Sequence, residues 1–516
     1  MNSGTRARDV AIAAVISIVF VAFQIQASLH AGALSFPPTY DDVVYYFDAA
    51  TRVQTFWQGR FTDLVHGYIS NPPQAPGATL LAAIGFLLFG IKPWAADSAN
   101  ALPLFVFVLV LMRLFSGLPL GIVLPAIIAV LGIPIFGLAI VEFRPDMWCA
   151  GLTVGGTLLI ALRDPRDTRT AAGAGIAFAT ALLMKPTFSP LVVILFGTAL
   201  VLRLAPYLRE RAQWWGATRA CLIVGGLAVL IAGPHYVLAL PELAYRYYPH
   251  LFGDLAEVWQ LRLSATEKAL YFLTSNGSLL RRWVYVGIPT LAVPLVLIIR
   301  RHELAWQASI IAILALIAYI IVSLLGRSPF VGSIFHAYVA GAIIICAATG
   351  LRMLYRSKTT KAAYVAAFAF LCLAVVTYRV PWYGGVHSPK IAASRQAAIA
   401  ETASFFRSDR DLARKTVVFV HIGQYMNPDT LAWRFLQDGT QIPTFAADVF
   451  SDDLARHVAL FGRSDYVITL TPDHPDSLRW LPSAKLADKI NGMLDAETGF
   501  ELAKTILPPG EPGEMR

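Results

Sequence analysis

The sequence is organised around the stretch Thr39-Tyr40-Asp41-Asp42-Val43-Val44-Tyr45-Tyr46-Phe47-Asp48, which directly follows the first long apolar run. Acidic side chains this close to hydrocarbon are costly unless they pair, bind a ligand or take part in chemistry. A second acidic cluster, Glu142-Phe143-Arg144-Pro145-Asp146, ends another apolar run about a hundred residues later. We therefore expect the two clusters to form the walls of a single active site.

The composition is that of a polytopic membrane protein. Of the 516 residues, 56% are hydrophobic and 15% are charged, against about 25% charged residues in an average soluble domain. The net charge of +9 fits the excess of Lys and Arg in cytoplasmic loops, so no nucleic-acid partner is expected. The four cysteines lie in apolar segments without metal-ligand spacing, and we interpret them as core residues.

Apolar segments recur along the first 380 residues. The first runs from about Val10 to Ser28 after Arg6 and Arg8, and no convincing cleavage site follows it, so we expect a retained span with a cytoplasmic amino end. The other segments are approximately 77–91, 98–112, 118–140, 147–163, 171–184, 187–205, 218–239, 283–299, 305–325, 331–351 and 361–378.

Dense basic loops decide which segments cross the membrane. These loops lie near residues 163–169, 203–219, 300–302 and 352–361. If all twelve apolar segments crossed, the loops would face outside, against the positive-inside rule. Leaving out 77–91, whose roughly fifteen residues are short for a span, places all the loops inside. The prediction is therefore about eleven transmembrane helices, with 77–91 half-inserted or on the outer surface.

The predicted fold is an all-α polytopic membrane module, residues 1–380, followed by a small extracytoplasmic α/β domain, residues 381–516. In this topology the first loop, the Glu142–Asp146 cluster, the 240–282 loop and the C-terminal part share the outer compartment. A surface helix is expected over 48–60. Within the C-terminal part, helix-like pieces at 389–407, 452–461 and 485–496 alternate with strand-like pieces at 416–421 and 466–470.

Asp41 and Asp42 are the candidate catalytic residues. A carboxylate can act as the general base that removes a proton from an attacking hydroxyl. Two adjacent carboxylates can also hold a divalent cation, Mg²⁺ or Mn²⁺, although nothing in the sequence requires a cofactor. The alternative is a helix N-terminus capped by acids. On a helix the two side chains diverge by about 100°, so only one of them is expected to be the base.

Candidate substrate-binding residues come from several outer corners. Pro145 fixes a turn from which Arg144 and Asp146 project, with Glu142 beside them; an ordinary interfacial Arg–Asp pair is the alternative. Tyr45 belongs to the first acidic stretch. The residues expected to contact a phosphate are Arg144 and also Lys185, Arg246, His250, Arg327 and His336. Interfacial snorkelling explains each of the last five equally well.

These motifs resemble the GT-C superfamily of polytopic glycosyltransferases, which includes protein O-mannosyltransferases and lipid A aminoarabinose transferases. The resemblance rests on Asp41-Asp42 after the first span, Glu142 to Asp146 after the third, the Pro-containing stretch 71–76 and the long outer loop 240–282, and it covers about residues 1–350. Asp-Asp stands where O-mannosyltransferases have Asp-Glu. No match to the acceptor-binding signature of oligosaccharyltransferases is visible, which disfavours protein N-glycosylation.

The resemblance implies a polyprenyl-phosphate sugar donor and transfer on the extracytoplasmic face of the cell membrane. The acceptor is a glycan, lipid or protein hydroxyl that attacks the sugar C1 with inversion, while Asp41 or Asp42 takes the proton. Glu142 and Asp146 would orient a substrate or a metal, and basic residues would neutralise the leaving phosphate. Two alternatives remain: a transporter or flippase of lipid-linked sugars, and a non-catalytic scaffold on the same fold.

Overall fold

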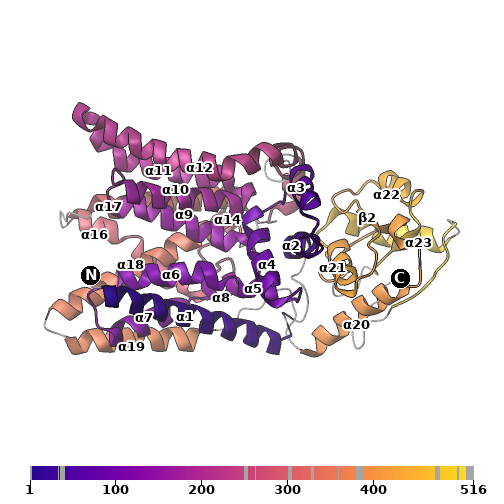
Figure 1. The fold of residues 1–516 in the computed structure, drawn as a ribbon, viewed down its shortest axis with the longest axis horizontal. Helices are drawn as coiled ribbons and strands as arrows, with labels where there is room; N and C mark the ends of the chain where they lie inside the picture. Colours follow the sequence, from indigo (N-terminus) through magenta and orange to yellow (C-terminus); the bar gives the residue numbers. More distant parts are fainter. Residues whose placement is uncertain are drawn as a thin grey trace.

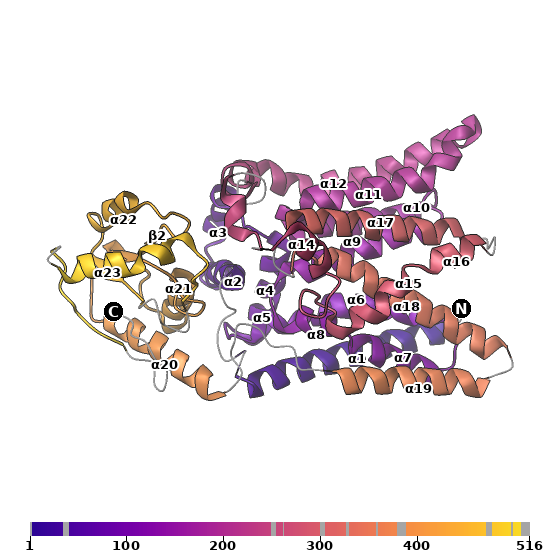
Figure 2. The same ribbon diagram turned by 180° about the vertical axis from the view of Figure 1, so that it is seen from behind.

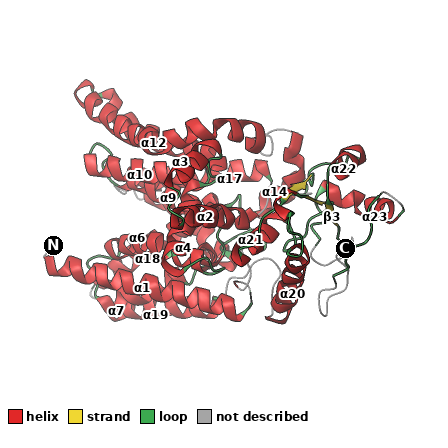
Figure 3. Cartoon of the chain, turned by 45° about the vertical axis from the view of Figure 1, so that its right-hand side comes forward, coloured by secondary structure: helices red, strands yellow, loops and turns green. Residues whose placement is uncertain are grey.

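The computed structural model describes residues 3–32, 34, 41–248, 254–261, 263–299, 305–326, 330–357, 360–378, 389–470, 477–496 and 499–506. Figures 1 and 2 show a long bundle of roughly parallel helices with the small C-terminal region at one end, and the N-terminus at the other. Helices dominate throughout, and the strands are confined to the C-terminal region (Figure 3).

The apolar segments build the bundle, most of them as single helices, whereas the segments expected at 118–140 and 283–299 each form two short helices. The bundle helices are α1 (Ser3–His30), α6 (Ala101–Leu114), α7 (Leu120–Leu131), α8 (Pro134–Val141), α9 (Pro145–Leu162), α10 (Thr168–Met184), α11 (Ser189–Leu204), α12 (Trp214–Glu242), α15 (Val284–Thr290), α16 (Val293–Ile299), α17 (Ala305–Leu325), α18 (Ser333–Arg356) and α19 (Thr360–Thr377).

In the described part of the chain, nine helices are long and apolar enough to cross a membrane, and α7 with α8 can make a tenth span bent by 63°. The multi-pass membrane protein predicted from the sequence is thus confirmed, with fewer qualifying spans than the eleven expected. The difference is the segment expected at 171–184. It forms α10, whose 17 residues are rich in Ala, Gly and Thr, and which packs between α9 and α12.

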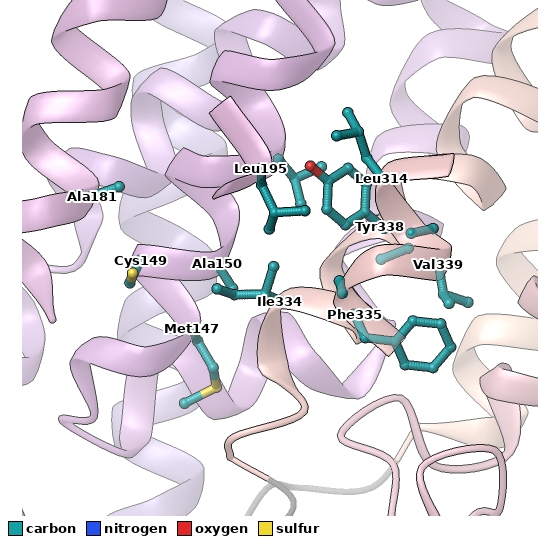
Figure 4. Packing of buried hydrophobic residues seen from close by; sticks show 14 of the residues in the cluster. Met147, Cys149, Ala150, Ala181, Leu195, Leu314, Ile334, Phe335, Tyr338 and Val339 are labelled. Carbon is teal, nitrogen blue, oxygen red and sulfur yellow. The ribbon is translucent and has the colours of Figure 1, made fainter. Parts of the chain in front are cut away.

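Buried side chains of α7 to α12, α15 and α17 to α19 make the main core, part of which is drawn in Figure 4. Met147 and Cys149 of α9 face this core together with Leu195 of α11 and Tyr338 of α18. The Tyr338 hydroxyl lies 2.8 Å from that of Thr157 on α9, so its one polar group is satisfied inside the bundle. The core-residue prediction for the cysteines holds for Cys149, whereas Cys346 is half-buried and Cys221 and Cys372 lie on exposed helix faces.

Four short helices cover the end of the bundle that faces the C-terminal region (Figures 1 and 2). They are α2 (Asp41–Trp57), α3 (Phe61–Ser70), α4 (Pro76–Phe89) and α5 (Ala95–Ser98). The segment expected not to span is α4, which has only 14 residues. Gly85 lets α4 meet α5 closely, since a Cβ there would lie 2.1 Å from the carbonyl oxygen of Ala95. The helix expected over 48–60 begins earlier, at Asp41, and packs on α4.

The long 240–282 segment is helical in pieces. α12 passes into a π-helical stretch, Leu243–Tyr247, and α14 (Ala265–Tyr271) packs on α17. The chain also contains short 3₁₀ helices, which are Pro186–Phe188, Ala205–Arg209, Arg211–Gln213, Asp254–Trp259, Arg281–Trp283, Leu412–Arg414 and Pro482–Leu486.

The C-terminal region contains a parallel three-stranded sheet in the order β2-β1-β3. Its strands are β1 (Thr416–Phe419), β2 (Thr444–Ala447) and β3 (Tyr466–Ile468), and its helices are α20 (Pro389–Phe406), α21 (Pro428–Asp438), α22 (Leu454–Phe461) and α23 (Ala487–Asp495). The expected strands and helices are all present, with strands shorter than predicted. Two elements were not predicted, β2 and α21.

The helix α21 had a readable sequence signal. Asn427 caps its N-terminus by accepting a hydrogen bond from the Thr430 amide, Pro428 is its first residue, and Gly439 ends it with φ 65°. Its apolar face is completely buried, part of it against α2. The C-terminal region therefore contacts the rest of the protein through the helix that the sequence interpretation missed.

Candidate active site

The first acidic cluster opens α2. Asp41 and Asp42 are the first two residues of this helix, and their side chains lie outside the described part of the structure. One helical turn after Asp41, Tyr45 is 2% exposed. A buried tyrosine at this position directs its hydroxyl toward the bundle. The beginning of α2 therefore faces the beginning of α9 and the end of α10.

The second acidic cluster joins α8 to α9. Glu142 directly follows α8, and Pro145 is the first residue of α9, which is where proline fits a helix best. Asp146 therefore lies in the first turn of α9, where the helix dipole favours a negative charge. Both carboxylates are buried. Arg144 lies between them, with its guanidinium 4.0 Å from the ring centroid of Phe330 and its Nε 3.9 Å from Glu142 Oε2.

Lys185 links the two clusters. It follows the last residue of α10, where the helix dipole favours a cation. Its Nζ lies 3.2 Å from Asp146 Oδ2 and 3.5 Å from the hydroxyl oxygen of Tyr45. The side chains of Lys185 and Asp146 are 16% and 6% exposed. Three residues far apart in the sequence, Tyr45, Asp146 and Lys185, thus form one largely buried polar contact at the end of the bundle.

His336 is placed differently from the other predicted phosphate contacts. It is buried in the first turn of α18, where its Nδ1 accepts from the Leu279 amide at 3.4 Å and its Nε2 lies 3.1 Å from the Phe272 carbonyl oxygen. One neutral tautomer, protonated on Nε2, satisfies both contacts. Close by, Ser333 donates to the Asp146 carbonyl at 3.3 Å, so the first turns of α18 and α9 are joined.

Three predicted residues cannot be placed. Arg327 and His250 lie outside the described residues, and for Arg246 only the backbone is described. Among the side chains that the structure does describe, no three His, Cys, Asp or Glu gather into a metal-binding group. The pair for which Mg²⁺ or Mn²⁺ was considered, Asp41 and Asp42, is not among those side chains.

Sequence reasoning missed two polar residues that support the site. Asp97 on α5 is fully buried and accepts a hydrogen bond from the Tyr46 hydroxyl at 2.5 Å. Asn100 donates to the Ile140 carbonyl at 3.0 Å and accepts from the Trp148 indole at 2.9 Å, which fixes the end of α8 just before Glu142. Asp97 could have been found, because it is the only acidic residue between 77 and 140.

A second polar contact attaches α2 to its neighbours. Asp48 pairs with Arg52 at 2.9 Å and accepts from the Thr79 hydroxyl of α4 at 3.0 Å. Burial raises the pKa of Asp48, and the neighbouring Arg52 opposes that effect. Arg52 also donates to the Asn71 carbonyl at 2.9 Å. These contacts are structural: they hold α2 against α4 and the turn that precedes it.

The site region and the C-terminal region each contain a cavity. Asn100, Glu142 and Arg144 line a small space of about 10 Å³, enough for one water molecule. A larger cavity of about 150 Å³ lies at the β3 edge of the sheet, between α20, β3 and α23, and none of its lining residues belongs to the acidic clusters.

Comparison with solved structures shows which fold this chain shares. No protein-family model matches the chain, and no curated protein matches it. The crystal structure of ArnT from Cupriavidus metallidurans bound to undecaprenyl phosphate matches with a TM-score of 0.56 and 13% identity, covering 100% of this chain and 98% of that one. The apo structure of the same protein matches with a TM-score of 0.57 and 14% identity, covering 99% and 97%. The whole chain thus has the ArnT fold, which confirms the GT-C-like architecture predicted from the sequence.

Proposed function

We propose that this protein is a membrane glycosyltransferase that moves a sugar from a polyprenyl-phosphate donor to an acceptor hydroxyl, with inversion at the sugar C1. The shared fold with ArnT supports a transferase of this kind, and the undecaprenyl phosphate bound to ArnT supports a polyprenyl-phosphate partner. The acceptor is a glycolipid, a polysaccharide or a protein hydroxyl. The sugar is a hexose or a pentose.

The observation that carries the proposal is the position of Lys185. Its ammonium group lies between Asp146 of the second acidic cluster and Tyr45, one helical turn after Asp41. A transferase of this type needs a base for the acceptor and a cation for the leaving phosphate within one site. The ammonium group of Lys185 touches a residue of each acidic cluster.

The proposed reaction divides the charges between the two sides of the sugar. Asp41 or Asp42 takes the proton of the acceptor hydroxyl as its oxygen forms a bond to C1. The bond between C1 and the phosphate oxygen breaks, and the negative charge that develops on the phosphate is stabilised by Lys185 and Arg144. Arg327, Arg246 and His250 are further candidates for the phosphate. Tyr45, Glu142 and Asp146 orient the substrates and the cation.

His336 has a different role in this proposal. Both ring nitrogens already contact backbone groups of residues 272–279. It therefore holds that segment against the first turn of α18, next to Asp146, and does not contact the phosphate directly.

The proposed reaction takes place on the extracytoplasmic face of the cell membrane, in bacteria the inner membrane. Figures 1 and 2 place α2 to α5 and the C-terminal region at one end of the bundle and the N-terminus at the other. Basic loops lie at the N-terminal end: Arg219 donates to the Arg166 carbonyl at 2.8 Å, and Arg166 stacks on Tyr207. By the positive-inside rule that end is cytoplasmic, which puts the acidic clusters outside.

Purified protein in lipid vesicles tests the proposal. With a set of polyprenyl-phosphate sugars and envelope glycolipid acceptors, we expect release of polyprenyl phosphate and a product of inverted anomeric configuration by NMR. Mass spectrometry of envelope glycolipids and polysaccharides from cells with and without the protein identifies the natural product. Movement of intact donor across the bilayer without cleavage would instead identify a transporter. If the protein shows neither transfer nor transport, the non-catalytic scaffold is the remaining alternative.

A further inference from the structure

A tryptophan of the C-terminal region is inserted into the core beneath the first acidic cluster. Trp433, on α21, is 1% exposed. Its ring centroid lies 5.5 Å from that of Tyr46 on α2 and 5.6 Å from that of Phe86 on α4. Next to it, the Gln54 side chain of α2 donates to the Leu436 carbonyl of α21 at 3.4 Å. The contact between the C-terminal region and α2 is therefore packed like a protein core.

Tyr46 connects this tryptophan to the candidate active site. Its ring packs edge-on against Phe143, in the middle of the second acidic cluster, with centroids 5.1 Å apart. Its hydroxyl donates to Asp97 on α5. The preceding residue, Tyr45, contacts Lys185. Any displacement of the Tyr46 ring would thus move the beginning of α2 relative to Phe143 and Lys185.

The tryptophan is held by packing alone. Among the described residues its indole N–H has no hydrogen-bond acceptor. A hydrogen bond is therefore not the reason for a tryptophan here, and a smaller aromatic ring should keep most of the contact. Truncation to alanine would leave a cavity on one side of Tyr46, in a helix whose main packing partners are α4, α21 and α3.

We infer that Trp433 is a positioning residue, through which the C-terminal region fixes α2 and its acidic pair in register with Lys185 and the second acidic cluster. This inference rests on the proposed glycosyltransferase function. Displacing a reacting group by about 1 Å can cost about 100-fold in rate, although the altered residue never touches the substrate. The C-terminal region is then part of the catalytic architecture.

Three variants of the full-length protein in lipid vesicles test this role. For Trp433→Ala we expect kcat to fall by about 100-fold while donor Kd and KM change by less than about threefold, because the base is displaced and the phosphate contacts are not. Trp433→Phe should retain kcat within about tenfold. The matched control is Trp480→Ala, a tryptophan of the same region that is 43% exposed, and it should behave as the wild type.

Hydrogen exchange provides a second measurement that does not need activity. Trp433→Ala should speed exchange of the amides of 43–53 by about tenfold or more, with the amides of β1 unchanged. If Trp433→Ala does not fold, Trp433→Leu replaces it, since leucine keeps apolar volume without the ring.

Two outcomes would overturn the inference. One is wild-type kcat and wild-type exchange of 43–53 in a folded Ala or Leu variant. The other is a fall in kcat for Trp433→Phe that is as large as the fall for Trp433→Ala. A wild-type protein that consumes no polyprenyl-phosphate sugar would overturn the proposed function instead, and the exchange measurement would still decide whether Trp433 orders α2.

Discussion

At the scale of single residues, Lys185 decides whether the two acidic clusters act together. Its ammonium group bridges Asp146 and Tyr45 in a largely buried place, where a charge–charge contact is stronger than in water. In the proposed reaction the short distance between these groups lets the lysine exchange a carboxylate for the donor phosphate without a large movement.

Lys185→Ala should lower turnover by about 10²–10³, the cost of losing a charge that stabilises the transition state. The measurement is steady-state turnover of the lipid-phosphate donor, made on protein that elutes and melts as the wild type does, because removing one partner of a buried ion pair is itself destabilising. Lys92→Ala, an exposed lysine of the connection between α4 and α5, is the matched control and should leave turnover unchanged. Equal turnover in both variants would assign Lys185 to packing.

Asp41 and Asp42 should differ in their effect. Asparagine keeps the size of the side chain but cannot take a proton, so at the position of the base it should lower turnover by roughly 10²–10⁴ while donor affinity survives. Asparagine at the other position should do less, because neighbouring positions on α2 face different directions. We expect the larger loss at Asp41. Near-normal turnover in both variants would mean that the acids only cap the helix.

His421 predicts how the C-terminal region responds to pH. Its two ring nitrogens lie 3.2 Å and 2.7 Å from the hydroxyls of Ser483 and Ser477, and burial lowers the pKa of His421 to about 4. Because the unfolded histidine binds a proton near pH 6.5 and the folded one does not, stability is complete above that pH and falls as the pH drops toward 4. The expected loss is up to about 3 kcal/mol.

Hydrogen exchange of the β1 amides between pH 7.5 and 4.5, corrected for the intrinsic exchange rate, measures this loss. His421→Gln should flatten the dependence of the opening free energy on pH, whatever its stability at neutral pH. An unchanged slope in the variant would show that another group is responsible.

At the scale of elements, α3 differs from the helices around it because none of its residues is buried. Phe61, Val65 and Ile69 follow one another at helical spacing and are all exposed, while Asp63 lies on the opposite face. The Tyr68 hydroxyl of α3 lies 3.4 Å from His235 Nδ1 of α12, and α12 itself exposes apolar side chains. This arrangement is typical of a helix lying in the membrane interface.

A nitroxide label on Val65→Cys should therefore be more accessible to oxygen than to a water-soluble relaxation reagent in lipid vesicles. The same label on His66→Cys, the next residue and about 100° around the helix, should show the reverse order. If the labels at both positions are equally accessible to the two reagents, α3 does not contact the lipid.

At the scale of the whole molecule, two chemically different ends support the proposed orientation in the membrane. Among the described residues, the basic loops 163–169 and 203–219 lie at the end of the N-terminus, and the acidic clusters and the C-terminal region lie at the other end. Nine or ten spans are identified in the described residues, and α10 is not one of them. The basic loops after α9 and before α12 are separated by α10 and α11, so they lie on the same side of the membrane only if α10 crosses it as α11 does.

Cysteine labelling in intact cells tests this orientation in a variant without the four native cysteines. An impermeant reagent should label Ser408→Cys, in the C-terminal region, and should reach Thr168→Cys, in a basic loop, only after the membrane is opened. The reverse pattern would invert the topology and would place the acidic clusters in the cytoplasm.

Local sequence was sufficient for the secondary structure of the membrane-spanning part. A run of about twenty apolar residues must be satisfied by its own backbone hydrogen bonds in lipid, so each span is determined within its own segment. The same holds for the short helix at 77–91 and for most elements of the C-terminal region, where caps and apolar periodicity are local signals. The 63° bend between α7 and α8 was not predicted, because 118–140 was expected as one segment.

The sequence also placed Asp146, Lys185 and Tyr45 at outer corners, but it could not say which side chains touch. Tyr45 and Lys185 are 140 residues apart, and their contact exists only because α2, α9 and α10 pack at one end of the bundle. The tertiary structure alone also revealed that Tyr46 lies between Asp97, Phe143 and Trp433. Burial of an aromatic ring is favourable wherever it finds apolar partners, and only the packing of α21 on α2 decides that Trp433 finds them there.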